Sequence, residues 1–267
     1  MRLQGIVGFR LVAADPARLT AFYRAIGFHV GELAPIAAAE MEQLGLRGAG
    51  SRIAMSLGPS RVDLDVFEAV GRPYPADAAA CDLLFQHLAL VTDDAEAAWR
   101  RARDAGAKPI SREGAVTLPA SSGGVTAVKF RDPEDHPLEF LTFPRGVNPD
   151  WNGAGVMGID HSAISVRDVA ASRDFYARLG LKAGAATVNK GPTQDALDGL
   201  DGVDVDVAPM SAKKTPPHLE LLGYRHPTGR AHPLMAANDI AATRILWRAD
   251  EDALVRDPDG HLHQLSR

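Results

Sequence analysis

The sequence contains a single cysteine, Cys81, and therefore cannot form a disulfide within the chain. No apolar run approaches the roughly 20 residues that a membrane-spanning helix needs. The first residues also lack the long apolar core of a secretory signal. These features predict a cytoplasmic protein that does not interact with membranes, in which Cys81 is incidental rather than a nucleophile.

Positive charge and aromatic side chains are also scarce. The chain has 29 Lys and Arg against 34 Asp and Glu, which gives a net charge of −5, and only 6% of its residues are aromatic. Arg100, Arg101 and Arg103 lie on a predicted helix whose other face is apolar, a pattern typical of a solvated helix face. The sequence therefore predicts no nucleic-acid partner, and it offers little for stacking a large planar ligand.

A pattern of strand, capping aspartate and short amphipathic helix occurs three times. The clearest copy is Met157–Gly180, in which Asp168 occupies the position of a helix N-cap. The N-terminal copy aligns with it without a gap and pairs Asp15 with Asp168, while the middle copy has Asp93 or Asp94 as the cap. Each copy begins a module with the order β-α-β-β-β.

The best linker in the chain is residues 144–155, which are rich in Pro, Gly and Asn. We expect a first half over residues 1–145 and a second half over residues 156–267. The fourth module has no room for a helix and is predicted to have lost it. The modules are expected at about residues 5–70, 83–145, 157–226 and 238–267.

Histidine and glutamate recur at matched positions of modules two and three. His87 and His161 lie in the first strands, whereas Glu139 and Glu220 lie in the closing strands between apolar neighbours. A glutamate in such a strand is rarely buried unless a cation or a metal pairs with it. If the two modules pack together, these four residues suit Zn, Ni, Mn or Fe and leave open coordination positions.

Modules one and four differ at the same positions. Gly8 and Asp63 occupy them in module one, and Arg244 and Gln264 occupy them in module four. Glycine offers no ligand and arginine repels a cation, so we expect a metal-free site if these modules pair, with Arg244 bridging Asp63. The sequence does not decide whether this second site has a role.

The openings GIDHSAISVRDVAASRDFY and FQHLALVTDD and the closings RDPEDHPLEFL and RDPDGHLHQL carry a family resemblance. With them, essentially the whole chain resembles the vicinal oxygen chelate superfamily, the glyoxalase, bleomycin-resistance and extradiol-dioxygenase group. The resemblance implies an α+β, glyoxalase-like fold of four βαβββ modules, the fourth shortened. In such a fold, cupped mixed β-sheets carry their helices outside.

The resemblance also implies a divalent metal that chelates two neighbouring oxygens of a small-molecule substrate. His87, Glu139, His161 and Glu220 match the glyoxalase-like ligand pattern, which requires module two to pack on module three. Extradiol dioxygenases instead take ligands from the fourth module, where this chain has Arg244 and Gln264. That departure argues against a ring-cleaving catechol enzyme of the familiar kind.

Two classes of function follow. The first is a metal-dependent lyase, isomerase or dioxygenase in which Glu139 or Glu220 acts as the base. The second is a metal-free protein that sequesters a ligand, as bleomycin-resistance members do. Loops such as Thr187–Leu200 and Pro119–Gly124 are expected to line the pocket, and the chain is expected to be a monomer or a homodimer.

Three further histidines and Tyr224 are assigned from their positions. His136 and His261 lie in DPEDHP and DPDGH sequences and are expected to serve in turns. His218 shares a strand face with Glu220 and is a candidate for supporting a ligand or contacting the substrate. Tyr224 lies on the same alternating face and could line the pocket.

Overall fold

The computed structural model describes residues 1–267. Module four consists of strands only, which confirms that its helix has been lost. Module one contains β1 (Leu3–Val12), α1 (Pro16–Ala25), β2 (His29–Pro35), α2 (Ala38–Gln43), β3 (Gly50–Leu57) and β4 (Ser60–Phe67). Module four contains β15 (Arg244–Ala249), β16 (Ala253–Arg256) and β17 (Leu262–Ser266).

Modules two and three keep their helices and gain short elements in the loops. Module two contains β5 (Gln86–Thr92), α3 (Ala95–Asp104), β6 (Lys108–Pro109), β7 (Val116–Thr117), the 3₁₀ turn η1 (Ala120–Ser122), β8 (Thr126–Arg131) and β9 (Pro137–Thr142). Module three contains β10 (Val156–Ser165), α4 (Val169–Arg178), β11 (Lys182–Ala183), β12 (Thr187–Lys190), α5 (Pro192–Asp198), β13 (Asp204–Ser211) and β14 (His218–His226).

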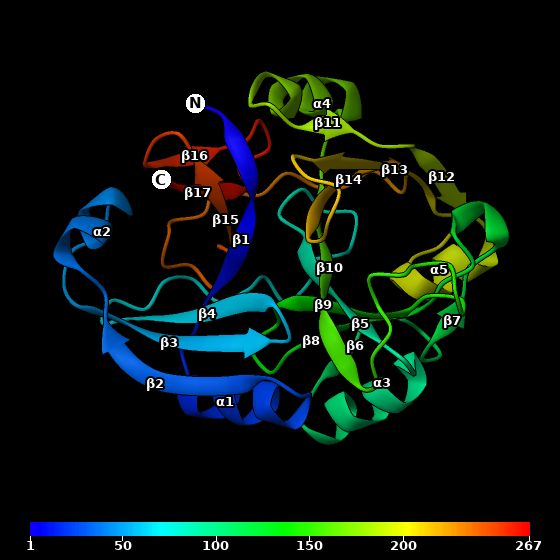
Figure 1. Ribbon diagram of the computed structural model, residues 1–267, viewed down its shortest axis with the longest axis horizontal. Coiled ribbons are helices and arrows are strands. Elements are labelled where there is room, and N and C mark those ends of the chain that lie inside the picture. The colour runs from blue at the N-terminus through cyan, green and yellow to red at the C-terminus, as the bar shows by residue number, and fades with distance from the viewer.

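The modules pair across the two halves of the sequence. A seven-stranded sheet in the order β16-β17-β15-β1-β4-β3-β2 joins modules four and one. A ten-stranded sheet, whose main path is β11-β13-β14-β10-β5-β9-β8-β6, joins modules three and two. Figure 1 shows the two curled sheets side by side, with α1, α3 and α4 on the outside. The predicted pairing of module two with module three is therefore present.

Aspartate caps begin the three ten-residue helices, as predicted. Asp15, Asp94 and Asp168 each accept a hydrogen bond from a backbone N–H in the first turn of the following helix. Apolar side chains of α1 and α3 then pack into the core. None of the helices is long and apolar enough to cross a membrane.

One core unites both sheets. The largest cluster of buried apolar side chains has 38 members, and it includes Phe9 and Val62 of the seven-stranded sheet with Phe140 and Leu219 of the ten-stranded sheet. Because the same cluster contacts both sheets, their outer faces are fixed against one another. The inner face of the ten-stranded sheet carries smaller apolar clusters together with the polar residues of the cavity.

Candidate metal centre

The register of the ten-stranded sheet brings the four predicted ligands together. β5 and β10 are antiparallel neighbours at its centre, and His87 pairs with Ala163 while His161 pairs with Ala89. Each central strand has a parallel neighbour, β9 or β14, that carries the glutamate of the same module. All four side chains therefore emerge near one point of the inner face.

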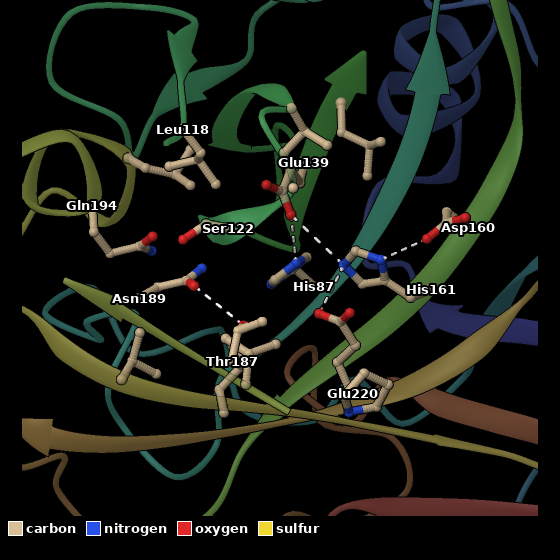
Figure 2. Close-up of a pocket in the computed structure, with 18 of the residues that line it drawn as sticks. His87, Leu118, Ser122, Glu139, Asp160, His161, Thr187, Asn189, Gln194 and Glu220 are labelled. Atoms are coloured by element: carbon tan, nitrogen blue, oxygen red, sulfur yellow. Dashed lines mark hydrogen bonds and ion pairs between the residues drawn. The ribbon is translucent and has the colours of Figure 1, made fainter. Parts of the chain in front are cut away.

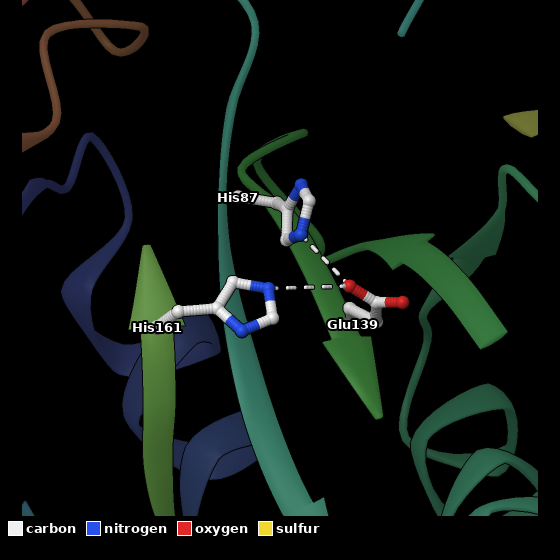
Figure 3. Close-up of side chains that lie close together, drawn as sticks. All are labelled: His87, Glu139 and His161. Atoms are coloured by element: carbon white, nitrogen blue, oxygen red, sulfur yellow. Dashed lines mark ion pairs between the residues drawn. The ribbon is translucent and has the colours of Figure 1, made fainter. Parts of the chain in front are cut away.

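The distances between these side chains are short. His87 Nε2 lies 2.8 Å from Glu139 Oε2, and His161 Nε2 lies 3.9 Å from the same oxygen. His161 Nε2 is also 3.5 Å from Glu220 Oε2. Figure 3 shows both imidazoles directed at the Glu139 carboxylate. One ligand atom from each of His87, Glu139 and His161 lies within 4.8 Å of the others, so the three can bind a single ion.

The donor set fits a divalent metal. His87 is fully enclosed, and neither of its ring nitrogens has a hydrogen-bond partner, although Nε2 lies close to Glu139. Buried polar atoms are normally satisfied, so a buried imidazole without a partner calls for an explanation. An ion bound between His87, His161 and the two glutamates would bind His87 through Nε2, the nitrogen that faces Glu139. Imidazole and carboxylate ligands of this kind are typical of Zn, Mn, Ni or Fe.

The charge around His161 favours a cation. Burial opposes protonation of its imidazole, but Glu220, Asp160 and Glu139 outweigh that effect and raise the pKa of His161 to about 9. At Glu220 burial has the opposite effect and raises the pKa of the carboxyl group, but His161 and His218 outweigh it and lower this pKa to about 2. At His87 burial dominates and lowers the pKa. The pocket thus combines ionised carboxylates with a neutral imidazole at His87 and a protonated one at His161, and a metal ion that bound there would replace the proton of His161.

Asp160 is a residue of the candidate site that the sequence analysis missed. Its Oδ2 accepts a hydrogen bond from His161 Nδ1 at 3.1 Å, which leaves Nε2 to face the glutamates. Strict alternation along the strand would send adjacent residues to opposite faces. The register of β10 against β5 shifts between Ile159 and His161, which makes Asp160 the extra residue of a β-bulge. The bulge lets neighbouring residues serve the same site, and alternation alone cannot reveal it.

His218 lies behind Glu220, as one of its predicted roles requires. Its Nε2 is 3.3 Å from Glu220 Oε1, on the carboxylate oxygen that does not face His161. His218 also forms a second close group with Asp160 and His161. It does not line the cavity beside the predicted ligands, and its contact is with Glu220.

A cavity of about 280 Å³ opens in front of the metal centre. Figure 2 shows His87, His161, Glu139 and Glu220 at one end, with Gln194, Asn189 and Ser122 at the other. The loops predicted to line the pocket supply Ser122, Gly123, Thr187, Asn189, Gln194 and Leu197, and Tyr224 also lines it.

The matched positions of the seven-stranded sheet hold a network of ion pairs. Arg244 Nη2 pairs with Asp65 Oδ2 at 2.6 Å, so the prediction that Arg244 bridges Asp63 was wrong. Asp63 instead pairs with Arg61 at 2.7 Å and with Arg10 at 3.4 Å. Arg10 pairs across the neighbouring strands with both Asp63 and Arg244. Its guanidinium, rather than that of Arg244, contacts the Asp63 carboxylate.

A fold of paired βαβββ modules with histidines and glutamates converging beside a cavity defines the class of glyoxalase-like proteins. The model of the Glyoxalase/Bleomycin resistance protein/Dioxygenase superfamily matches residues 5–140 and 158–265. The chain belongs to this superfamily. None of the curated proteins matches the sequence.

Two solved structures illustrate the similarity of fold. Glyoxalase I from Zea mays shares 15% identity and a TM-score of 0.62, over 98% of this chain and 91% of that chain. A putative dioxygenase from Bacillus subtilis subsp. subtilis str. 168 shares 14% identity and a TM-score of 0.59, over 99% of this chain and 85% of that chain. At this identity the likeness establishes the fold alone.

Proposed function

We propose that the protein is a metal-dependent enzyme that acts on a small oxygenated organic molecule. His87, Glu139, His161 and Glu220 would hold one divalent ion. When bound, the ion supplies Lewis-acid chemistry by holding two neighbouring oxygens of the substrate. The observation that carries the proposal is the convergence of four donors from two modules, three of them buried and Glu220 half-buried, beside a cavity.

Glu220 is the better of the two candidate bases. Its side chain is 18% exposed against 9% for Glu139, and its Oε1 contacts His218, which is itself 23% exposed. Glu220 is therefore the carboxylate that a substrate in the cavity reaches more readily. Glu139 lies against His87 deeper in the wall, where it holds the imidazole instead.

Lyase, isomerase and dioxygenase chemistry all use such a site. Two histidines with one carboxylate form the facial ligand set of non-haem Fe(II) oxygenases, and a further glutamate suits Zn, Ni or Mn isomerases. The metal identity therefore decides which assay applies. A metal-free, antibiotic-sequestering role fits less well, because the cavity is small and its deep end is charged.

The test is elemental analysis of protein purified without a metal-chelating tag. We expect about one Fe, Mn, Ni or Zn per chain, and loss of the metal in the His87→Ala, His161→Ala double variant. His226→Ala is the matched control, because this histidine is exposed and hydrogen-bonds only to the Gly202 carbonyl. A native protein that neither contains nor takes up a metal at micromolar concentration rules the proposal out.

A cytoplasmic location and a small-molecule substrate are part of the same proposal. The four modules complete both sheets within one chain. A monomer therefore needs no partner to form the cavity, and a homodimer would form through the remaining sheet edges.

A further inference from the structure

Asp198 organises a second polar cluster in the cavity wall. Its Oδ1 lies 2.6 Å from Lys129 Nζ, and its Oδ2 accepts hydrogen bonds from Gln194 Nε2 at 2.8 Å and from the Tyr224 hydroxyl at 2.9 Å. Lys129, Gln194 and Asp198 are each at most 4% exposed. Lys129, Gln194 and Tyr224 line the same cavity as the metal ligands.

The cluster is held rigidly by contacts between modules two and three. The Ser111 hydroxyl accepts a hydrogen bond from Lys129 N–H and donates one to the Leu197 carbonyl, each at 2.8 Å. Gly199 ends α5 with φ +66°, and a Cβ there would lie 2.3 Å from the Ile110 carbonyl oxygen. The end of α5 is thus fixed against module two, and Asp198 is fixed with it.

Two groups in this cluster retain unused hydrogen-bonding capacity. Gln194 Oε1 is buried and has no partner. Its orientation is fixed, because a carboxylate only accepts and therefore the amide nitrogen must face Asp198. Lys129 has three donors, of which Asp198 uses one. The cluster therefore offers a ligand one acceptor and at least one donor, both anchored on the same carboxylate.

The charge of the cluster restricts what can bind there. Lys129 contacts Asp198 and is also the ladder partner of Glu139, so its positive charge is compensated and an anionic ligand group would meet no free positive charge. A carboxylate would place a third acceptor beside Asp198 and Gln194 Oε1, and an ammonium would meet Lys129. A hydroxyl group satisfies both free positions, because it accepts from Lys129 and donates to Gln194.

We propose that Lys129 and Gln194 form a recognition point for a neutral hydroxyl group of the substrate, separate from the two oxygens at the metal. This inference rests on the proposed function, since it assigns a second contact to the molecule that the metal holds. Lys129 and Gln194 select the substrate and are not themselves given a part in the chemistry.

The probes are alkyl hydroxamates, which chelate zinc through two neighbouring oxygens. Chains of graded length would end in methyl, methoxy or hydroxyl groups, and Kd values for the zinc-loaded full-length protein would be measured by calorimetry. A methoxy group accepts but does not donate, so the three ends separate the two contacts. At the best length we expect the hydroxyl probe to bind about tenfold more tightly than the methoxy probe, as one hydrogen bond to a buried acceptor allows.

Two variants assign the contacts. In Gln194→Met the advantage of hydroxyl over methoxy should disappear, while the affinity of the methyl probe stays the same. In Lys129→Met the advantage of methoxy over methyl should disappear, and the Lys129→Met, Asp198→Asn double variant avoids leaving Asp198 unpaired. The control is His226→Ala, because His226 is exposed, hydrogen-bonds only to the Gly202 carbonyl and should not alter the ratios.

Ratios of Kd separate recognition from a merely structural role, which would weaken all three probes together. Equal affinities for the three ends at every length, or ratios unchanged in both variants, would overturn the inference while leaving the metal centre intact. Zinc content measured in the same samples shows whether the proposed metal-dependent function itself fails. If no zinc binds, the proposed function falls, and the inference falls with it.

Discussion

His161 is the residue on which most of the candidate metal centre depends. It faces Glu139 and Glu220 with one ring nitrogen and Asp160 with the other. A carboxylate on the second nitrogen fixes the tautomer and orientation of a metal-binding imidazole and makes it a stronger ligand. Trp151 holds this carboxylate in turn, through a hydrogen bond of 3.1 Å from Nε1 to Asp160 Oδ1.

Removing the charge of Asp160 should therefore weaken metal binding without removing a ligand. We expect Asp160→Asn to lower zinc affinity by about 10- to 100-fold, in line with other residues that orient a metal-binding histidine. Competition with a chromophoric zinc chelator at pH 7.5 measures the change. Asp206→Asn is the matched control, since Asp206 loses the same charge at a surface ion pair with Arg225. Equal zinc affinity in Asp160→Asn and the native protein would show that His161 needs no such support.

The candidate metal ligands could be predicted from the sequence because they recur at equivalent positions of the repeat. His87, His161, Glu139 and Glu220 stand at equivalent positions of two modules, and the strand periodicity places each pair on one face. Asp160 could not be found this way, because a bulge changes which face it joins. Lys129 and Asp198 were missed for another reason, since they meet only when α5 of module three docks on β8 of module two.

At the scale of elements, α2 and α5 are equivalent segments of the repeat that cover the inner faces of their sheets differently. In module one, Glu40 of α2 accepts hydrogen bonds from Arg10 and Arg52 and from Gln264, and so covers the inner face of the seven-stranded sheet. In module three, Asp198 of α5 binds Lys129 in the cavity wall and leaves the cavity open. The same segment of the repeat therefore closes one inner face and shapes the other.

The DP turns connect elements of different modules. Their aspartates, Asp132 and Asp257, accept backbone N–H groups of His136 and His261, which confirms the turn role predicted for these histidines. The same two aspartates accept hydrogen bonds from the hydroxyls of Tyr23 and Tyr176, each at 3.0 Å. Each turn thus ties the first helix of one module to the closing hairpin of the next. The sequence predicted the turns but not these ties.

His263 of β17 extends one of these ties and makes it sensitive to pH. Trp247 Nε1 donates to His263 Nδ1 at 3.0 Å, so the ring proton lies on Nε2 and faces the Tyr176 hydroxyl at 2.9 Å, which donates to Asp257. A second ring proton would break the bond from Trp247. Burial lowers the pKa of His263 to about 4, although Asp257 opposes this effect, and nearby His261 lowers the pKa further.

The lowered pKa predicts a loss of stability in mild acid. The unfolded chain takes up a proton at the ordinary histidine pKa of about 6.5, whereas the folded protein resists until about pH 4. Between these values the unfolded state binds more protons, so the free energy of unfolding should fall as pH falls, by up to about 1.4 kcal/mol per pH unit from this residue.

Urea unfolding of metal-free protein from pH 7 to pH 4 measures this contribution. His263→Gln keeps an acceptor for Trp247 but cannot be protonated, so its stability deficit relative to the native protein should shrink as pH falls. All other titrating groups are common to both proteins and cancel in the difference. His226→Gln controls for loss of a histidine at the surface, and a deficit for His263→Gln that stays constant with pH would contradict the prediction.

At the scale of the whole molecule, both sheets are built from both halves of the sequence. β1 of the first half pairs with β15 of the second, and β5 pairs with β10. The metal ligands follow the same division, with His87 and Glu139 from the first half and His161 and Glu220 from the second. Neither half alone contains a complete site or complete sheets.

This arrangement predicts that the peptide link between the halves is dispensable once the protein has folded. The linker is exposed at residues 145–147, and Gly146 has open space beside its backbone. A protease site inserted there should allow complete cleavage while the two fragments elute together from a gel-filtration column and keep the zinc affinity of the intact chain. The shared core and the paired strands, rather than the linker, hold the halves together. Halves that folded independently would instead separate on dilution and each lose zinc binding, because every fragment would hold only one histidine and one glutamate of the site.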